Sequence, residues 1–354
     1  MAGMIRPWPQ GRIIPTRPGL RQRARRCIQL GMSRLVIFCV LLAAVVVRGV
    51  HAAPEASLRG IKRAFAVTPG CTLVVDTYHG EIAVEESEGS EIRIELNVDF
   101  DVQTEADATR LWEGLKTSFD SANNTVRVVA RNDVATGPRL SWNDERRMNL
   151  YYRITVPRQC HVDLKTGRGK VMVGRLAGRM SARVEAGTIF FRQIDGSIDA
   201  ATGEGELVIS RCTGAVKARV RQGSIRVGTI GGAADLRTAN GSVEVMQARS
   251  GLKVQAEVGD VTVNFPRDYS GNANLTSLGG NVTVQVDPAA NCDLDAAAAW
   301  GRVRNKLPLT GVSGGDGQRR VSGRLNRGGA KIKVLADGGA VTLAPGETLF
   351  EEVK

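Results

Sequence analysis

The sequence has few of the side chains on which most enzymes rely for catalysis. Histidine occurs three times in 354 residues, and only His79 and His161 lie beyond residue 52. No CxxC or HExxH spacing is present, and no two histidines fall within one helical turn. His161 directly follows Cys160, but adjacent strand residues point to opposite faces, so the two are not expected to form a catalytic dyad. The sequence therefore predicts no metal, no cofactor and no catalytic residue.

Lysine and acidic residues are absent from the first 52 residues, which contain nine arginines and so carry a charge of +9. Because the formal net charge of the chain is +12, the remaining 354 − 52 = 302 residues carry only 12 − 9 = +3. No basic run with interleaved aromatic residues follows in that part. The distribution of charge therefore argues against a nucleic-acid partner.

The apolar run near the amino terminus is short. Residues 35–47 form 13 apolar residues, fewer than the roughly 20 that a membrane-spanning helix needs. The run suits a signal peptide, and Val50-His51-Ala52 fits the small-residue cleavage rule, so we expect export with a cut after Ala52. The destination would be the periplasm, the outer surface or the medium. An uncleaved membrane anchor at residues 35–47 is the alternative, and Met32 is an alternative start to Met1.

Helical periodicity is absent between residues 162 and 263, where glycine sets a different period. Each of six glycines, spaced 18 residues apart, opens the pattern glycine, any residue, aliphatic, any residue, aliphatic or aromatic. A fixed period of this kind is the signature of a repeat architecture. The six are predicted to be structural turn glycines: Gly169, Gly187, Gly205, Gly223, Gly241 and Gly259.

Within each repeat, apolar residues alternate with polar ones, which is the period of a strand with one buried face. One 18-residue unit cannot bury its own apolar face, but stacked units align their side chains in columns. The sequence therefore predicts an all-β fold, a right-handed parallel β-solenoid (β-helix) with 18-residue rungs. A β-sandwich is the competing prediction. The expected inward columns hold Val171, Ile189, Leu207, Ile225, Val243 and Val261; then Val173, Phe191, Ile209, Val227, Val245 and Val263; and Leu176, Ile194, Cys212, Ile230 and Ala248.

Residues 98–150 interrupt the repeat. Thr104 and Asp107 resemble a capping box, and five apolar residues from Ala108 to Phe119 then fall at helical spacing. We therefore expect one inserted amphipathic helix at about 104–119. The expected organisation is a basic leader and signal peptide (1–52), an amino-terminal segment with the first rung (53–97), the insertion (98–150), the β-solenoid domain (151–345) and a carboxyl-terminal tail (346–354).

Two outward columns are candidate binding surfaces. A basic column is either a solvated face or a contact for anionic glycan, lipid head groups or an acidic partner. An apolar column is either ordinary exposed strand surface or a strip covered by the 104–119 helix or by a second copy. The basic column consists of Lys165, Arg183, Arg219 and Arg237, and the apolar column consists of Met172, Phe190 and Val208.

Four cysteines lie beyond the leader. Cys212 occupies an inward column between isoleucines, where a small buried hydrophobe is expected. Cys71 and Cys160 each precede a turn glycine by nine residues, so a disulfide between them is predicted if their rungs are neighbours in an oxidising compartment.

Polysaccharide-active β-helices are the enzyme alternative, because they place acids together on one outer face. The outward acids of this chain are scattered, and nothing in the sequence ties the most suggestive two, Glu206 and Glu244, to each other.

Several segments carry a resemblance to a known family: GEIAVEESEGSEIRIEL, RITVPRQCHVDLKTGRGKVMVGRLAG, the tandem GTIFF, GELVI, GSIRV and GSVEV units, and NRGGAKIKVLADGGAVTL. From Thr72 to about Leu343 the chain resembles the bacterial "putative adhesin" β-strand-repeat family, domain of unknown function 4097. The resemblance implies a right-handed β-helical domain, exported or displayed at the cell envelope, with no known catalytic residues.

Together these features predict an exported, non-enzymatic, adhesin-like binding or scaffold protein of the bacterial envelope. Its partner would be a glycan, an envelope protein or its own copies, and it would contact a membrane only through an uncleaved leader. A periplasmic stress-sensing or regulatory module is the alternative, and a polysaccharide-active enzyme is the second alternative.

Overall fold

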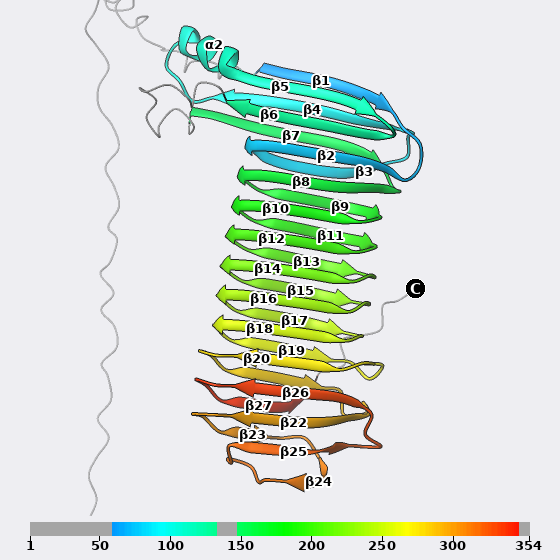
Figure 1. Cartoon of the computed structure of the whole chain (residues 1–354), viewed down its shortest axis with the longest axis vertical. Helices are drawn as coiled ribbons and strands as arrows, with labels where there is room; N and C mark the ends of the chain where they lie inside the picture. The colour runs from blue at the N-terminus through cyan, green and yellow to red at the C-terminus, as the bar shows by residue number, and fades with distance from the viewer. Residues whose placement is uncertain (1–58, 133–146, 347–354) are drawn as a thin grey trace, which may run out of the picture. The chain divides into compact units, whose positions relative to one another are not determined.

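The computed structural model describes residues 59–132 and 147–346, all of which belong to one compact unit, Pro54–Lys354. Two long β-sheets face each other across a continuous core (Figure 1). We name them sheet A, with 13 strands, and sheet B, with 14. Each regular rung contributes one strand to each sheet, so the fold is the predicted β-solenoid.

The repeat from Gly187 shows how a rung forms. Strand β11 (Ile189–Asp195) runs in sheet A, the chain turns at Gly196, and β12 (Ile198–Glu204) returns in sheet B. Ile189 lies beside Val171 of the preceding rung and Leu207 of the following one, so the parallel ladder steps by 18 residues.

The other regular strands follow the same pattern. In sheet A they are β9 (Val171–Ala177), β13 (Leu207–Cys212), β15 (Ile225–Ile230), β17 (Val243–Ala248), β19 (Val261–Phe265) and β21 (Val282–Val286). In sheet B they are β8 (Cys160–Arg168), β10 (Met180–Ala186), β14 (Val216–Gln222), β16 (Ala234–Asn240), β18 (Leu252–Val258) and β20 (Ala273–Ser277).

Antiparallel strands close the amino-terminal end. The first rung, β2 (Cys71–His79) and β3 (Glu81–Ser87), lies directly beside the rung of β8 and β9. Five further strands, one before this rung in the chain and four between it and β8, lie on its outer side. These strands are β1 (Arg59–Ala66), β4 (Glu91–Phe100) and β7 (Met148–Pro157) in sheet A, with β5 (Leu115–Ala122) and β6 (Thr125–Asn132) in sheet B.

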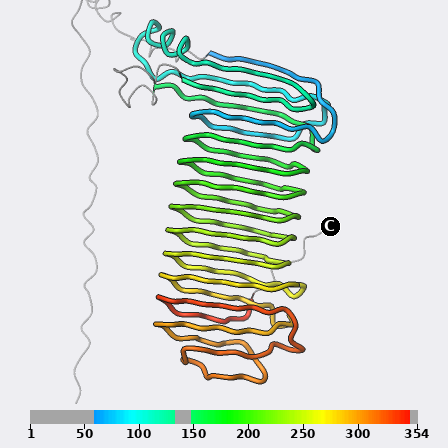
Figure 2. Tube along the Cα trace, in the orientation of Figure 1, coloured from blue at the N-terminus to red at the C-terminus, as the bar shows by residue number. Residues whose placement is uncertain are grey.

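The carboxyl-terminal end departs from sequence order. The last rung, β26 (Ala330–Ala336) and β27 (Val341–Pro345), lies between the rung of β20 and β21 and the rung of β22 (Cys292–Ala298) and β23 (Val303–Asn305). Figure 2 shows this red segment between yellow and orange ones. Beyond β22, β25 (Arg320–Leu325) and β24 (Thr310–Ser313) pair antiparallel. The last segment of the chain therefore fills an internal place in the stack.

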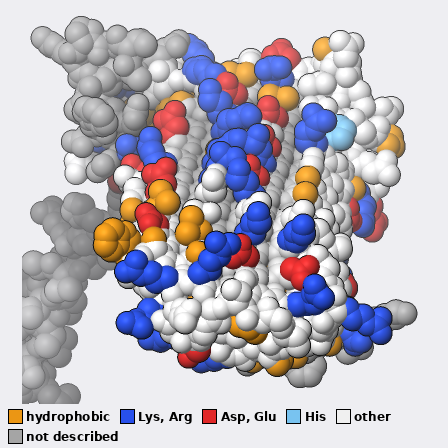
Figure 3. All heavy atoms as spheres, turned by 60° about the horizontal axis from the view of Figure 1, so that its bottom comes forward, with side chains coloured by type: hydrophobic (Ala, Val, Ile, Leu, Met, Phe, Trp, Pro, Cys, Tyr) orange, Lys and Arg blue, Asp and Glu red, His pale blue; other side chains and the backbone are white. Residues whose placement is uncertain are grey.

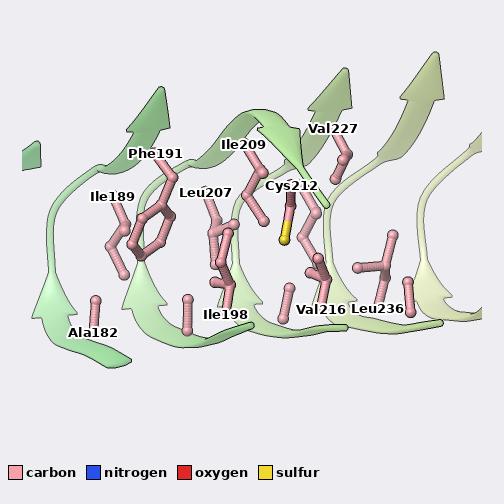
Figure 4. Packing of buried hydrophobic residues seen from close by; sticks show 14 of the residues in the cluster. Ala182, Ile189, Phe191, Ile198, Leu207, Ile209, Cys212, Val216, Val227 and Leu236 are labelled. Atoms are coloured by element: carbon pink, nitrogen blue, oxygen red, sulfur yellow. The ribbon is translucent and has the colours of Figure 1, made fainter. Parts of the chain in front are cut away.

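The core consists of the predicted columns. Every residue of the three columns is buried, and Figure 4 shows Ile189, Phe191, Leu207 and Ile209 projecting between the sheets. A fourth inward column alternates hydroxyl and aliphatic residues, because Thr202 lies between Val184 and Val220. The buried Thr202 hydroxyl donates hydrogen bonds to the carbonyls of Gly187 and Glu204, at 3.1 and 3.0 Å. The hydroxyl adds a side-chain hydrogen bond at a corner where the Glu204 carbonyl already accepts one from the backbone N–H of Gly187, so the buried hydroxyl itself is satisfied.

The turn glycines are required for two independent reasons. Gly205 has a φ of +123°, a region that residues with a Cβ rarely adopt. A Cβ at Gly205 would also overlap the carbonyl oxygen of Gly187, one rung away. The other five turn glycines have φ values between +132° and +153°.

The inserted helix is shorter than predicted. Helix α2 (Glu105–Gly114) begins as expected, with the Thr104 hydroxyl accepting a hydrogen bond from the backbone N–H of Asp107. It ends before Leu115, because residues 115–122 form β5 and pair with β6 through a two-residue turn at Asn123 and Asn124. Both asparagines have positive φ, as this hairpin turn requires. The helical spacing of Leu115 and Phe119 was therefore misleading.

Candidate binding groove on sheet B

The predicted basic column lies on the outer face of sheet B. Lys165 of β8 pairs in register with Arg183 of β10, and Arg183 pairs with Ala201 of β12. Ala201 in turn pairs with Arg219 of β14, which pairs with Arg237 of β16. The four cations therefore occupy one column over five adjacent strands, with a single alanine between the second and the third.

A groove of about 720 Å³ follows this column across the strands from β8 to β20. Its floor is low where the outward residues are small, at Ala201, Gly203 and Ala239, and long side chains form its walls. In the space-filling view, Lys and Arg side chains gather in a band across one face, with Asp and Glu interleaved (Figure 3). The charged lining residues are Lys165, Arg183, Arg219, Arg221, Arg237, Glu185 and Glu257, which sum to 5 − 2 = +3.

Beside the basic column, aspartates on alternate rungs partly balance the arginines, with Ser181, Lys217 and Lys253 on the rungs between and beyond them. Arg237 makes a bidentate contact with Asp235, with both nitrogen–oxygen distances at 2.8 Å. This hydrogen-bonded guanidinium holds the pKa of Asp235 below its ordinary value, and the nearby Lys253 and Arg219 act in the same direction. Both carboxylate oxygens of Asp235 are therefore engaged by Arg237.

The other arginines are held less tightly. Arg183 lies 3.8 Å from Asp163, and Arg219 lies 4.0 Å from Asp199. Both distances exceed a hydrogen bond, so the guanidinium donors remain available to another acceptor. Lys165 and Arg221 make no ion pair with any residue in the described ranges. The groove thus presents four cationic side chains, Lys165, Arg183, Arg219 and Arg221, whose N–H donors can form hydrogen bonds with a ligand.

Arg221 and the floor of the groove were not identified from the sequence. A signal for them exists, because a 36-residue period overlies the 18-residue period. Thr166-Gly167, Thr202-Gly203 and Thr238-Ala239 recur at this longer spacing, with a small outward residue each time. Small outward residues therefore recur on every second rung, and Gly203 and Ala239 of this series line the groove.

The predicted apolar column lies on the opposite sheet. Met172, Phe190 and Val208 are neighbours in register on the outer face of sheet A, and all three are half-buried. Helix α2 lies at the end of the stack, where Arg59 bonds Glu105 and Trp112 packs edge-on against Phe100. The helix therefore does not cover this column, because it belongs to the closing end instead. Covering by a second copy stays a prediction.

The two predicted disulfide partners are neighbours in register. Cys71 of β2 pairs with Cys160 of β8, and both side chains are fully buried as free thiols. Burial and the adjacent Cys71 thiol raise the pKa of Cys160, which keeps this thiol protonated. Cys212 is buried, as expected, and its thiol donates to the Gly196 carbonyl at 3.1 Å.

The two outward acids singled out from the sequence are joined by an arginine, contrary to expectation. Arg226 contacts Glu206 at 2.7 Å and Glu244 at 4.0 Å, because it occupies the rung between them on sheet A. Within the described residues, no group of three or more histidine, cysteine or acidic side chains is placed to hold a metal ion. Nor does that part of the chain contain a helix long and apolar enough to cross a membrane.

The chain matches one protein-family model and is similar in fold to several solved structures. A family model described as Toastrack DUF4097 matches residues 72–344. No curated protein matches. Among solved structures, the chain is similar to a "putative adhesin" from Bacteroides fragilis, with 14% identity, a TM-score of 0.38, and coverage of 81% of this chain and 97% of that one. It is also similar to a "putative lipid binding protein" from Parabacteroides distasonis, with 11% identity, a TM-score of 0.40, and coverage of 81% and 98%.

Proposed function

This chain belongs to the Toastrack DUF4097 family, and from that premise we propose that it is a non-enzymatic, adhesin-like binding protein of the bacterial cell envelope. Its ligand lies in the groove on sheet B. The observation that carries this proposal is the groove itself, in which available cations surround a floor of small residues. Parallel ladders on both sides of the core fix the backbone beneath the groove, so a ligand needs to order only the side chains of its walls.

The position of the acids in the groove supports binding rather than glycoside hydrolysis. Glu185 and Glu257 lie in one outward column but four rungs apart, or about 19 Å at a strand spacing of ~4.8 Å. Glycosidases place their two carboxyl groups between about 5 and 9.5 Å apart. These two glutamates are therefore too distant to act as a general acid and base on one glycosidic bond.

Envelope location is part of the proposal and rests on the leader. The segment 35–47 and the cleavage pattern ending at Ala52 support export, and both lie outside the described residues. Protease treatment of intact cells that express the full chain tests this directly. Release of rung peptides, together with a mature terminus at Ala53, supports surface display. Protection until the outer layer is opened supports a periplasmic location, and an uncut leader supports an anchor.

The binding role is tested with the protein purified from those cells and with isolated cell envelopes. Wild-type protein should co-sediment with envelopes, whereas the Ala201→Trp variant should remain in solution because the indole fills the floor of the groove. Thr283→Trp is a matched control, since Thr283 faces outward on sheet A. Equal sedimentation of wild type and Ala201→Trp would show that the groove is not the binding surface.

A further inference from the structure

The direction of the groove restricts the shape of its ligand. The lining residues come from seven consecutive strands of sheet B, from Lys165 on β8 to Leu278 just beyond β20. Six steps of about 4.8 Å make a length of roughly 29 Å along the stack. The groove is therefore longer than a single small molecule, and an extended ligand that crosses the strands fits it best.

The charge pattern restricts the chemistry of the ligand. Arg183 and Arg219 flank Ala201 and lie two rungs apart, or about 9.6 Å at a strand spacing of ~4.8 Å. Arg221 leans over the adjacent Gly203, where an added Cβ would lie 3.1 Å from its guanidinium nitrogen. Planar guanidinium groups with free donors match carboxylates, which they can bind with two parallel hydrogen bonds. Two acidic groups separated by a two-rung interval would meet Arg183 and Arg219, and the next such position holds Gln255, an uncharged hydrogen-bond donor.

The lining of the groove also favours some classes of polymeric ligand over others. None of its residues is aromatic, whereas proteins that bind single-stranded nucleic acid stack the bases on aromatic side chains. The half-buried floor at Ala201, Gly203 and Ala239 lies below the arginine side chains, so a flat membrane surface would not reach it. Acidic sugars carry their carboxylates at the edge of the ring, where the arginine side chains beside the floor can reach them. The two-rung interval is comparable to the length of two linked pyranose rings.

We infer that the groove binds a linear acidic polysaccharide, laid along the stack with sugar carboxylates between the arginines of alternate rungs. This inference rests on the proposed function and names the ligand class for the same groove. Arg183, Arg219 and Arg221 bind the carboxylates, and Lys165 extends the cationic wall by one rung. The small residues of the floor accept the sugar rings.

The first experiment measures calorimetric binding of galacturonate oligomers to the purified protein. A hexamer should bind at least about tenfold more tightly than a dimer, because only the longer chain reaches several arginines. Affinity should fall as salt rises. Methyl-esterified hexamer is the matched neutral probe and should not bind. Equal affinity for the esterified and free hexamers would overturn the inference.

The second experiment separates the groove from general positive charge. Arg183→Gln/Arg219→Gln should weaken binding of the hexamer by about tenfold or more, which corresponds to about 1.4 kcal/mol or more. Ala201→Trp should weaken it equally without changing the charge. Lys331→Gln/Lys333→Gln removes the same charge from exposed positions of β26 on the same sheet, outside the groove, and should bind like wild type. Unchanged thermal unfolding confirms that each variant is folded.

The outcomes separate this inference from the function beneath it. Suppose that Ala201→Trp abolishes binding to envelopes but galacturonate oligomers do not bind. This result would overturn the inference of a polysaccharide ligand and leave the groove as the binding surface. Tighter binding of single-stranded DNA or of vesicles with anionic lipid would also overturn it. An equal loss in the Lys331→Gln/Lys333→Gln control would show that only net charge is sensed.

Discussion

At the scale of single residues, the fold depends on positions where two neighbouring rungs nearly touch. Gly205 illustrates this, because both its backbone angle and the carbonyl of Gly187 exclude a side chain. The same close contact between a turn glycine and the carbonyl oxygen of the preceding turn glycine recurs from rung to rung along one edge of the stack. The corner glycines therefore act as spacers, and their loss would disturb two rungs at once.

Gly205→Ala should lower the free energy of unfolding by about 3 kcal/mol, since it combines a strained φ with an overlap that forces two rungs apart. Gly317→Ala is the matched control, because Gly317 also has a positive φ of +77° but no neighbour within 4 Å. It should lose only about 1 kcal/mol. Urea denaturation measures both, and equal losses would show that contact between rungs is unimportant.

Cys71 and Cys160 should form a disulfide when the chain folds in an oxidising compartment. Two thiols lose two protons and two electrons to a disulfide oxidoreductase, and a sulfur–sulfur bond forms between neighbouring strands. The bond would close a loop of almost 90 residues and contribute on the order of 4 kcal/mol in the loop-entropy model. Because burial and Cys71 raise the pKa of Cys160, we expect the bond to form before the core closes.

Mass spectrometry of unreduced peptides tests this directly. A linked pair of peptides containing Cys71 and Cys160 is expected, and Cys71→Ser should lower the melting temperature. Cys292 is buried far along the stack and should not take part in a disulfide. Cys292→Ala is therefore the control, in which the linked pair of peptides should still be found. Quantitative alkylation of Cys71 and Cys160 after unfolding without reductant would contradict the prediction.

At the scale of strands, the inward columns carry the stability. Ile225 is fully buried between Leu207 and Val243, so Ile225→Asp would place a charge in the core without a partner. We expect a loss of several kcal/mol in the free energy of unfolding, of order 3 or more. Thr283→Asp adds the same charge at an outward position and should change little. An unchanged melting temperature for Ile225→Asp would mean that the column is wrongly placed.

The same scale shows what the sequence could predict. The columns around Ile189 and Phe191 follow from alternation and an 18-residue period, because each rung pairs with its sequence neighbour. The end of α2 was missed because Leu115 and Phe119 satisfy both a helical and an alternating pattern, and pairing with β6 decides between them. The basic column was visible, but the groove was not, because its depth comes from the small residues Ala201 and Gly203.

At the scale of the whole molecule, the carboxyl-terminal end differs from the amino-terminal end because its last rung, β26 and β27, pairs out of sequence order. Ala330 to Ala336 carries the expected rung pattern, yet its place between β20 and β22 has no local signal. At the amino-terminal end both sheets finish in antiparallel strands, whereas at the other end sheet B finishes in antiparallel β25 and β24 and sheet A in the short parallel strand β23. Short or charged edge strands resist pairing with another molecule. β23 and β24 are short, and β1 exposes Lys62 and Arg63.

We therefore expect no open-ended filament. Sedimentation velocity over a wide concentration range should show a species of fixed size, because β23 and β24 are short and the longer edge strands β1 and β5 carry exposed charges. If a second copy covers the apolar column of Met172, Phe190 and Val208, that species is larger than a monomer and Phe190→Lys converts it to one. Particles that lengthen steadily with concentration would show that the ends do pair.

Removal of residues 330–354 should prevent the stack from closing, because β22 loses its parallel partner and β20 keeps a partner on only one side, β18. The shortened chain is expected to unfold without a sharp thermal transition and to aggregate. Removal of residues 347–354 alone is the control, since it leaves β26 and β27 complete. A cooperative transition in the shorter variant at the wild-type temperature would contradict the prediction.

The internal place of the last rung also sets the timing of biogenesis. While the chain is being synthesised or threaded through a narrow channel, its final residues emerge last, and the gap between β21 and β23 stays empty until then. The native arrangement is therefore reached only after the whole polypeptide has been released. A chain made in this order stays incompletely folded until residues 330–345 have emerged, which is compatible with the export proposed above.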